Sequence, residues 1–169
     1  MSEPLQRIPA WRLRDADRGI RLFVTAFLLL LTSGYGIGLA FVDNTTAATP
    51  QGLAEHFRGT PENAQSPEIK YAKSPVEMYT FLHNHILSLA LVFFAIGGIF
   101  YFTSMPPGLI KDFLIVEPFI AILTTFGGIW FMRYVSEYFS WLVLFSGISM
   151  VGCYLIMVIS ILKELWLRK

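Results

Sequence analysis

Two histidines lie two residues apart in the stretch Tyr79–Leu89, which reads YTFLHNHILSL. The chain has only three histidines, His56, His83 and His85, and the last two stand near the start of a long apolar run. An ionisable side chain inside a membrane-spanning segment costs free energy to insert, so it indicates a functional site unless it merely hydrogen-bonds to a neighbour. Imidazole binds metals and haem iron and also exchanges protons. The stretch therefore predicts either a cofactor or proton site, or structural hydrogen bonding.

The two imidazoles are expected to point in opposite directions. Residues two apart on an α-helix are separated by about 200° of rotation, so His83 and His85 cannot hold one ion while the helix is regular. A helix that begins at Pro75 places both rings about 12–15 Å from its start, at a rise of ~1.5 Å per residue. We therefore expect only one of the two rings to serve a given site.

Four glycines lie at the same predicted depth on two other helices: Gly36, Gly38, Gly127 and Gly128. Helix backbones without side chains leave room for a flat macrocycle, so these glycines beside the histidine pair predict a cofactor slot of the kind that haem requires. Gly34 and Gly38 also form a GxxxG pattern, which is typical of membrane helices that pack closely. Close helix packing is therefore the alternative role of these glycines.

Haem b usually takes two axial imidazoles, and no other predicted membrane helix contains a histidine. A second ligand would have to be His56, Met132 or a residue of another chain. Copper is an alternative cofactor, since imidazole and thioether groups are suitable copper ligands. A bound quinol is a further alternative, and the chain could also bind no cofactor. The predicted metal ligands are His56, His83, His85 and Met132.

Glu117, which precedes Pro118, is the only charged residue between Asp112 and Arg133. An ionised carboxylate facing lipid would cost about 2.5–3.5 kcal/mol, so Glu117 is expected to face the bundle, to be protonated or to approach the membrane interface. Proton uptake, quinone hydrogen bonding and a hydrogen bond to a serine or threonine of another helix are its three alternative roles. The single cysteine, Cys153, is expected to be a packing residue.

These side chains must be positioned by membrane helices. Of the 169 residues, 54% are hydrophobic and 15% are charged, a composition typical of integral membrane proteins. Uncharged runs, each able to cross a hydrocarbon core of ~30 Å, predict four transmembrane helices at 22–42, 75–103, 109–132 and 138–162. The second begins at a capping box, Ser74–Glu77, and ends before the tandem prolines 106 and 107. We predict one all-α membrane domain over 1–169, a four-helix bundle with a cytoplasmic arm at 1–20.

The outer segment at 43–74 is polar but contains a short predicted helix. Thr49 is a predicted N-cap, Pro50 suits the first helical position and Gly59 supplies a stop, so a helix is expected over 50–58. Leu53 and Phe57 lie four residues apart, on one face. This helix is therefore predicted to be amphipathic and to lie on the membrane surface or to fold over the end of the bundle.

Basic residues gather at both chain ends. They are Arg7, Arg12, Arg14, Arg18 and Arg21, and Lys163, Arg168 and Lys169. Basic flanks mark the cytoplasmic side of a membrane, so both termini are predicted to be cytoplasmic. The first apolar run follows a polar arm and no cleavage site is evident, so we expect a retained helix rather than a signal peptide.

Several function classes have no support in the sequence. The net charge of only +1 gives no electrostatic basis for binding nucleic acid. There is no serine–histidine–acid set, P-loop or dinucleotide-binding fingerprint. We therefore do not expect the chain to be an enzyme on its own.

The short outer helix around Gly52–Gly59, the Lys73–Pro75 lead-in, the His-Asn-His at 83–85 and the Glu-Pro-Phe at 117–119 together resemble small bacterial four-helix inner-membrane proteins. The resemblance spans residues 20–165 and implies a multi-pass protein of the bacterial inner membrane, without catalytic residues. The layout, with histidine near the outer leaflet, is also similar in architecture to b-type cytochromes and to the membrane anchors of respiratory complexes.

The working hypothesis is a membrane subunit of an electron-transfer or respiratory assembly. It would contribute a haem, metal or quinol site near the outer face through His83 or His85, and its partners would be lipid and other membrane or periplasmic subunits. The alternative is a non-catalytic scaffold or accessory subunit whose histidines are structural.

Overall fold

Four long helices form the body of the protein. The computed structural model describes residues 11–61 and 69–167. The elements within these ranges are η1 (Leu13–Asp15), α1 (Arg18–Thr46), α2 (Pro50–Arg58), α3 (Pro75–Tyr101), α4 (Leu109–Tyr134) and α5 (Phe139–Trp166). α1, α3, α4 and α5 are each long and apolar enough to cross a membrane. The predicted all-α bundle with four spans and one short extra helix is confirmed. Arg7, Arg168 and Lys169 lie outside the described residues.

The starts of α2 and α3 follow local signals in the sequence. Thr49 Oγ1 accepts a hydrogen bond of 3.0 Å from the Gly52 amide, and Pro50 is the first residue of α2. Ser74 Oγ accepts a hydrogen bond of 3.3 Å from the Glu77 amide, while Glu77 Oε2 accepts one of 2.8 Å from the Ser74 amide. These bonds satisfy amides that have no partner inside the helix. Both predicted helix starts are confirmed.

α1 extends beyond its predicted range of 22–42 at both ends. At its start, Asp17 is the N-cap and accepts a hydrogen bond of 2.9 Å from the Ile20 amide. At its end, the side chains of Thr45 and Thr46 donate to the carbonyl oxygens of Phe41 and Val42, at 2.8 and 2.7 Å. Polar residues thus continue the helix past the apolar run, with their side chains bonded to the helix's own backbone.

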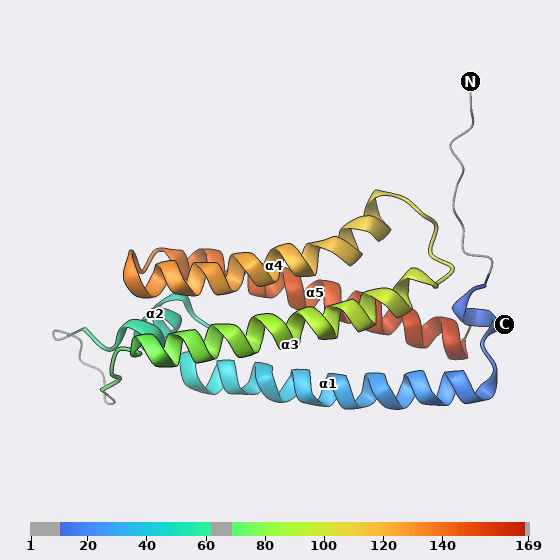
Figure 1. Ribbon diagram of the computed structural model, residues 1–169, viewed down its shortest axis with the longest axis horizontal. Helices are drawn as coiled ribbons and strands as arrows, with labels where there is room; N and C mark the ends of the chain where they lie inside the picture. The colour runs from blue at the N-terminus through green and yellow to red at the C-terminus, as the bar shows by residue number, and fades with distance from the viewer. Residues whose placement is uncertain (1–10, 62–68, 168–169) are drawn as a thin grey trace, which may run out of the picture.

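α4 and α5 form the central pair of the bundle, and α3 packs against both of them (Figure 1). α1 runs along the side of the bundle, where it contacts α2 and α5 but has scarcely any contact with α3 or α4. Only Val24, Leu28 and Thr46 of α1 are buried, whereas α4 and α5 each bury ten residues. α1 is therefore the most loosely held of the four spans.

α2 lies at one end of the bundle, called here the α2 end, where α1 and α4 finish and α3 and α5 begin (Figure 1). Its apolar face, with Leu53 and Phe57 buried, covers this end of the bundle, which is the second of the two placements that the sequence left open. Two basic side chains of the segment between α1 and α3 donate to carbonyl oxygens near the C-terminal ends of α1 and α4. Lys70 Nζ bonds to Thr45 at 2.8 Å, and Arg58 Nη1 bonds to Met132 at 2.7 Å. Such carbonyls have no partner within their helix and carry partial negative charge, so the cations stabilise them.

Two buried charged residues hold the opposite end, called here the η1 end. Lys111 Nζ donates to the carbonyl oxygens of Tyr101 and Thr103 at 2.8 and 3.0 Å. Glu164 of α5 accepts hydrogen bonds of 2.6 and 2.8 Å from the hydroxyl and amide of Ser104. Together these bonds fix the connection between α3 and α4, which contains the predicted proline break.

Candidate functional site

His85 is oriented by a hydrogen bond within α3. Its Nδ1 atom lies 2.9 Å from the carbonyl oxygen of Phe81. Because a carbonyl oxygen can only accept, Nδ1 must carry the hydrogen, and Nε2 of the neutral ring is then left with a free lone pair. Histidines that bind metals usually have this arrangement, in which the other ring nitrogen donates to a carbonyl or carboxylate. Nε2 of His85 is therefore an oriented acceptor.

Aromatic rings surround this imidazole on one side. The His85 ring lies 4.2 Å from the Phe81 ring and 5.5 Å from the ring of Phe126 on α4, measured between centroids. Phe81 also contacts Phe57 of α2, at 5.3 Å. Phe126 is buried, but the His85 ring is exposed. The site is thus an accessible imidazole set against an aromatic wall near the α2 end.

His83 and His85 lie on opposite faces of α3, as their spacing predicted. His85 is 7 residues from Met78 and 11 from Ile96, spacings that place all three on one stripe, and both apolar residues are fully buried. His85 is nevertheless exposed, although its ring contacts Phe126 of α4. His83 is also exposed, and within the described part of the chain its side chain makes no hydrogen bond or ring contact. His85 is the histidine that faces toward the bundle.

The other predicted metal ligands do not join His85. His56 is half-buried on α2, where its ring contacts Phe57. Burial, followed by the positive charges of Lys73 and Lys70, holds the pKa of His56 below its ordinary value. Met132 is fully buried at the end of α4. Among residues 11–61 and 69–167, no three His, Cys, Asp or Glu side chains lie close enough together to hold a metal ion.

The four predicted glycines have different surroundings. A Cβ added at Gly128 would meet Val143 of α5 at 2.9 Å, so this glycine allows α4 and α5 to approach closely. A Cβ added at Gly127, Gly36 or Gly38 would have no atom within 4 Å. The structure therefore gives Gly128 a packing role and leaves the other three beside open space, without bringing any of them against the His85 ring.

Glu117 lies in a polar centre that the sequence did not reveal as a group. Its Oε2 atom is buried and has no hydrogen-bond partner in the described residues. The carboxyl group interacts with the Cys153 thiol of α5 and with the Tyr35 phenol of α1. The expected serine or threonine partner is absent from this part of the described chain, and Cys153 takes its place. Sequence spacing cannot show that Cys153 reaches Glu117, because this depends on how α4 and α5 are rotated toward each other.

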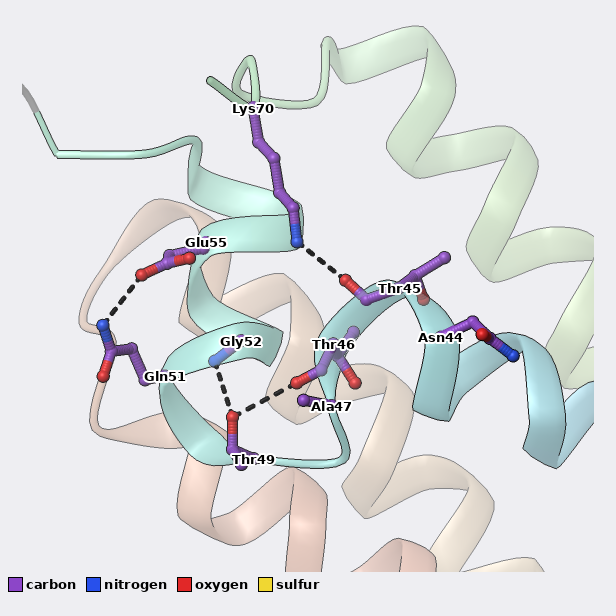
Figure 2. A pocket seen from close by; sticks show the side chains of 9 residues that line it. All are labelled: Asn44, Thr45, Thr46, Ala47, Thr49, Gln51, Gly52, Glu55 and Lys70. Carbon is purple, nitrogen blue, oxygen red and sulfur yellow. Dashed lines mark hydrogen bonds between the residues drawn. The ribbon is translucent and has the colours of Figure 1, made fainter. Parts of the chain in front are cut away.

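A shallow polar pocket lies at the α1–α2 junction (Figure 2). It is lined by Asn44, Thr45, Thr46, Ala47, Thr49, Gln51, Gly52, Glu55 and Lys70. Its main polar groups already bond to one another: Lys70 Nζ bonds to the Thr45 carbonyl, and Gln51 Nε2 donates to Glu55 Oε1 at 2.9 Å. We interpret this pocket as part of the contact that holds α2 against the end of α1.

The comparison with protein families matches residues 47–169 to Aq_1264_TM, a transmembrane helical domain. The chain belongs to this family. The Aq_1264_TM match begins directly after α1 and includes α2, α3, α4 and α5. His56, His85, Phe126, Glu117 and Cys153 all lie within it. No curated protein and no solved structure matches the chain significantly.

Membership of the Aq_1264_TM family agrees with the resemblance seen in the sequence and establishes a multi-pass membrane protein. α1 lies outside the matched residues, and it is also the span with the fewest buried side chains. The matched part of the chain is thus the tightly packed part of the bundle, together with its α2 cover.

Proposed function

We propose that this chain is a membrane subunit of an electron-transfer assembly in the bacterial inner membrane, and that it binds a quinol through His85. The hydrogen bond from Nδ1 to the Phe81 carbonyl carries the proposal, because it leaves Nε2 as an accessible acceptor. A quinol hydroxyl is a suitable donor to that atom. The aromatic rings of Phe81 and Phe126 suit contact with the quinol ring.

A quinol fits this site better than haem or copper does. Haem b usually needs a second axial imidazole, but His83 points away from His85 and His56 lies on α2 beside two lysines. A copper site needs several convergent ligands, and the described residues contain no group of three or more His, Cys, Asp or Glu side chains. A quinol requires only one oriented acceptor and an apolar wall, which His85 and Phe126 supply.

Oxidation of a quinol to a quinone releases two protons and two electrons. In this proposal, Nε2 of His85 takes one proton from the bound hydroxyl, and the second proton leaves to the aqueous phase at the α2 end. Both electrons pass to a haem or metal centre of a partner subunit, which is why the function belongs to an assembly. The contribution of this chain is to bind and orient the quinol and to accept a proton.

A structural role for His85 is the second candidate. The bond to Phe81 lies within one helix, so it would form equally well in a scaffold protein that binds no ligand. The two candidates differ in one observable property: quinol binding requires Nε2 to have a ligand, and the structural role does not.

Quinol binding by the purified protein in lipid nanodiscs tests the proposal. A short-chain ubiquinol should bind the wild type at about one per chain, and His85→Ala should weaken binding about tenfold or more, equivalent to about 1.4 kcal/mol. His83→Ala is the matched control, because it removes an equally exposed imidazole from the opposite face of the same helix. Absence of binding to the wild type, or equal losses in both variants, would overturn the proposal. A reducible Soret band or tightly bound copper would also overturn it, in favour of haem or metal.

A further inference from the structure

The polar centre around Glu117, whose side chain is partly buried and whose Oε2 atom is fully buried, lies away from the His85 site. Glu117 is nine residues before Phe126 on α4, a separation of about 13 Å along the helix. Both lie on the same continuous helix, Leu109–Tyr134. The carboxyl group is therefore well separated from the imidazole, and its chemistry does not depend on whether a quinol binds at His85.

Two groups of other helices interact with the Glu117 carboxyl group, Cys153 through a hydrogen bond and Tyr35 electrostatically. α5 contributes the Cys153 thiol, which is 3% exposed, and α1 contributes the Tyr35 phenol. The Tyr35 ring stacks on Tyr154 of α5 at 4.2 Å and is nearly parallel to it, at 3°. The Tyr154 hydroxyl is 3.0 Å from that of Thr32 on α1. These contacts join α1 to α5 beside Tyr35, and a further hydrogen bond of 3.0 Å, from Trp166 Nε1 to Thr25 Oγ1, joins them nearer the η1 end.

No positive charge of the described residues pairs with this carboxyl group. Within the described chain, Glu117 forms no ion pair, and its titratable neighbours are the thiol of Cys153 and the phenol of Tyr35. α3 packs on the same region with Phe93, which contacts Tyr154 edge-on and carries no charge. Oε2 remains without a partner. An ionised carboxylate with an unbonded oxygen in such surroundings costs several kcal/mol, whereas a neutral acid costs far less.

We propose that Glu117 is a proton-binding site inside the membrane, which holds a proton in the resting protein and releases it reversibly. The proton resides on a carboxyl oxygen, and its transfer to water leaves a carboxylate that accepts a hydrogen bond from the Cys153 thiol and interacts electrostatically with the Tyr35 phenol. The thiol belongs to α5, and the phenol belongs to α1, which packs on α5 at this level through Tyr35, Tyr154 and Thr32. Binding and release of the proton therefore act at the contact between α1 and the rest of the bundle.

Infrared spectroscopy of the protein in lipid provides the test. The wild type should show the C=O stretching band of a protonated carboxylic acid at neutral pH, and the band should disappear as the pH is raised. Glu117→Gln, which is close in shape, should lack the band, and Glu117→Asp should retain one. Absence of the band from a folded wild type would overturn the proposal. A band that persists unchanged at alkaline pH would also overturn it, because the acid would then be permanently neutral.

Carbodiimide labelling supplies a second, independent measurement. Dicyclohexylcarbodiimide reacts with protonated carboxyl groups in apolar surroundings, and the modified residue is identified by peptide mass spectrometry. Glu117 should be labelled, and labelling should fall by about tenfold for each pH unit above its midpoint. Glu164 is the matched control, because it is also buried but is bonded to Ser104, and it should remain unlabelled. Equal labelling of both residues, or protection of Glu117 by sodium ions at fixed pH, would overturn the proposal.

Discussion

Gly128 of α4 faces Val143 of α5 so closely that a Cβ on the glycine would stand 2.9 Å from Val143 Cγ2. Its neighbour Gly127 has no atom within 4 Å of the corresponding position. Two adjacent glycines of one helix therefore have different roles. One of them sets the distance between the two central helices, and the other faces open space.

A leucine at Gly128 should separate α4 from α5. Val143 is β-branched and has little freedom to move aside, so Gly128→Leu is expected to lower the free energy of unfolding by about 1–3 kcal/mol. Gly127→Leu, the matched control, should change it by less than about 0.5 kcal/mol. Unfolding by a denaturing detergent, followed by tryptophan fluorescence, measures both. Equal effects of the two variants would show that the α4–α5 contact does not depend on Gly128.

Gly52 should be equally intolerant of a side chain, at the junction of α1 and α2 near the same end of the bundle. A Cβ at this position would overlap the carbonyl oxygen of Thr46, a backbone atom that cannot rotate away (Figure 2). We expect Gly52→Ala to displace α2 from the end of α1 and to lower the free energy of unfolding by about 1–3 kcal/mol, even though alanine favours helices. Gln51→Ala, at an exposed position of the same helix, is the control. A neutral Gly52→Ala variant would mean that α2 can shift freely.

The sequence predicted those features of the fold that depend on local chemistry. Thr49 and Ser74 begin helices because their hydroxyl groups satisfy amides three residues ahead, and that pattern is visible in one dimension. The opposed directions of His83 and His85 likewise follow from helix geometry alone. The role of Gly128 could not be separated from that of Gly127, because the distinction depends on how α4 is rotated toward α5.

The rotation and tilt of the helices also explain which contacts at the candidate sites the sequence did not reveal. Cys153 was expected only to fill space, but it meets Glu117 because α4 and α5 are the central pair. Gly36 and Gly38 were placed at the depth of the histidines, but α1 stands too far from α3 for that depth to produce a contact. Glu164 and Ser104 are 60 residues apart in the chain, and no local pattern links them.

Glu164 should stabilise the η1 end through its bonds to Ser104. Glu164→Gln keeps the size of the side chain but loses the charge and one acceptor oxygen, so we expect a loss of about 1–2 kcal/mol in the free energy of unfolding. Asp112→Asn, at an exposed position nearby in the fold, should have little effect. The double variant Glu164→Gln, Ser104→Ala should cost less than the sum of the single changes, because both remove one interaction. Full additivity would contradict the assignment.

His56 should make stability depend on pH. Its pKa in the folded protein is below the ordinary value of about 6.5, first because it is partly buried and then because Lys73 and Lys70 are near. The unfolded chain therefore binds the proton more readily than the folded chain does. Stability is complete above about pH 6.5 and declines as the pH falls through 6.5 toward the folded pKa.

Substitution of His56 tests this dependence. His56→Gln should reduce the difference in melting temperature between about pH 8 and about pH 5, compared with the wild type. Gln51→Ala, which removes no titratable group from the same helix, should leave that difference unchanged and serves as the control. A steeper dependence in His56→Gln would mean that the protonated imidazole stabilises the folded state.

The orientation of the bundle in the membrane is defined by which of its two ends faces the cytoplasm. Pro61 lies just beyond α2, while α5 ends at Trp166 at the opposite end of the bundle, beside η1 (Figure 1). The basic residues at both chain ends predict that the η1 end is cytoplasmic, because basic flanks are retained on that side.

A reporter domain inserted after Pro61 should therefore be periplasmic, and one fused after Lys169 should be cytoplasmic. Three spans, α3, α4 and α5, separate these points, so finding both reporters on one side would contradict the four-span fold. Finding the two sides exchanged would retain the fold but place the His85 site on the cytoplasmic side, where a quinol would release its protons inward.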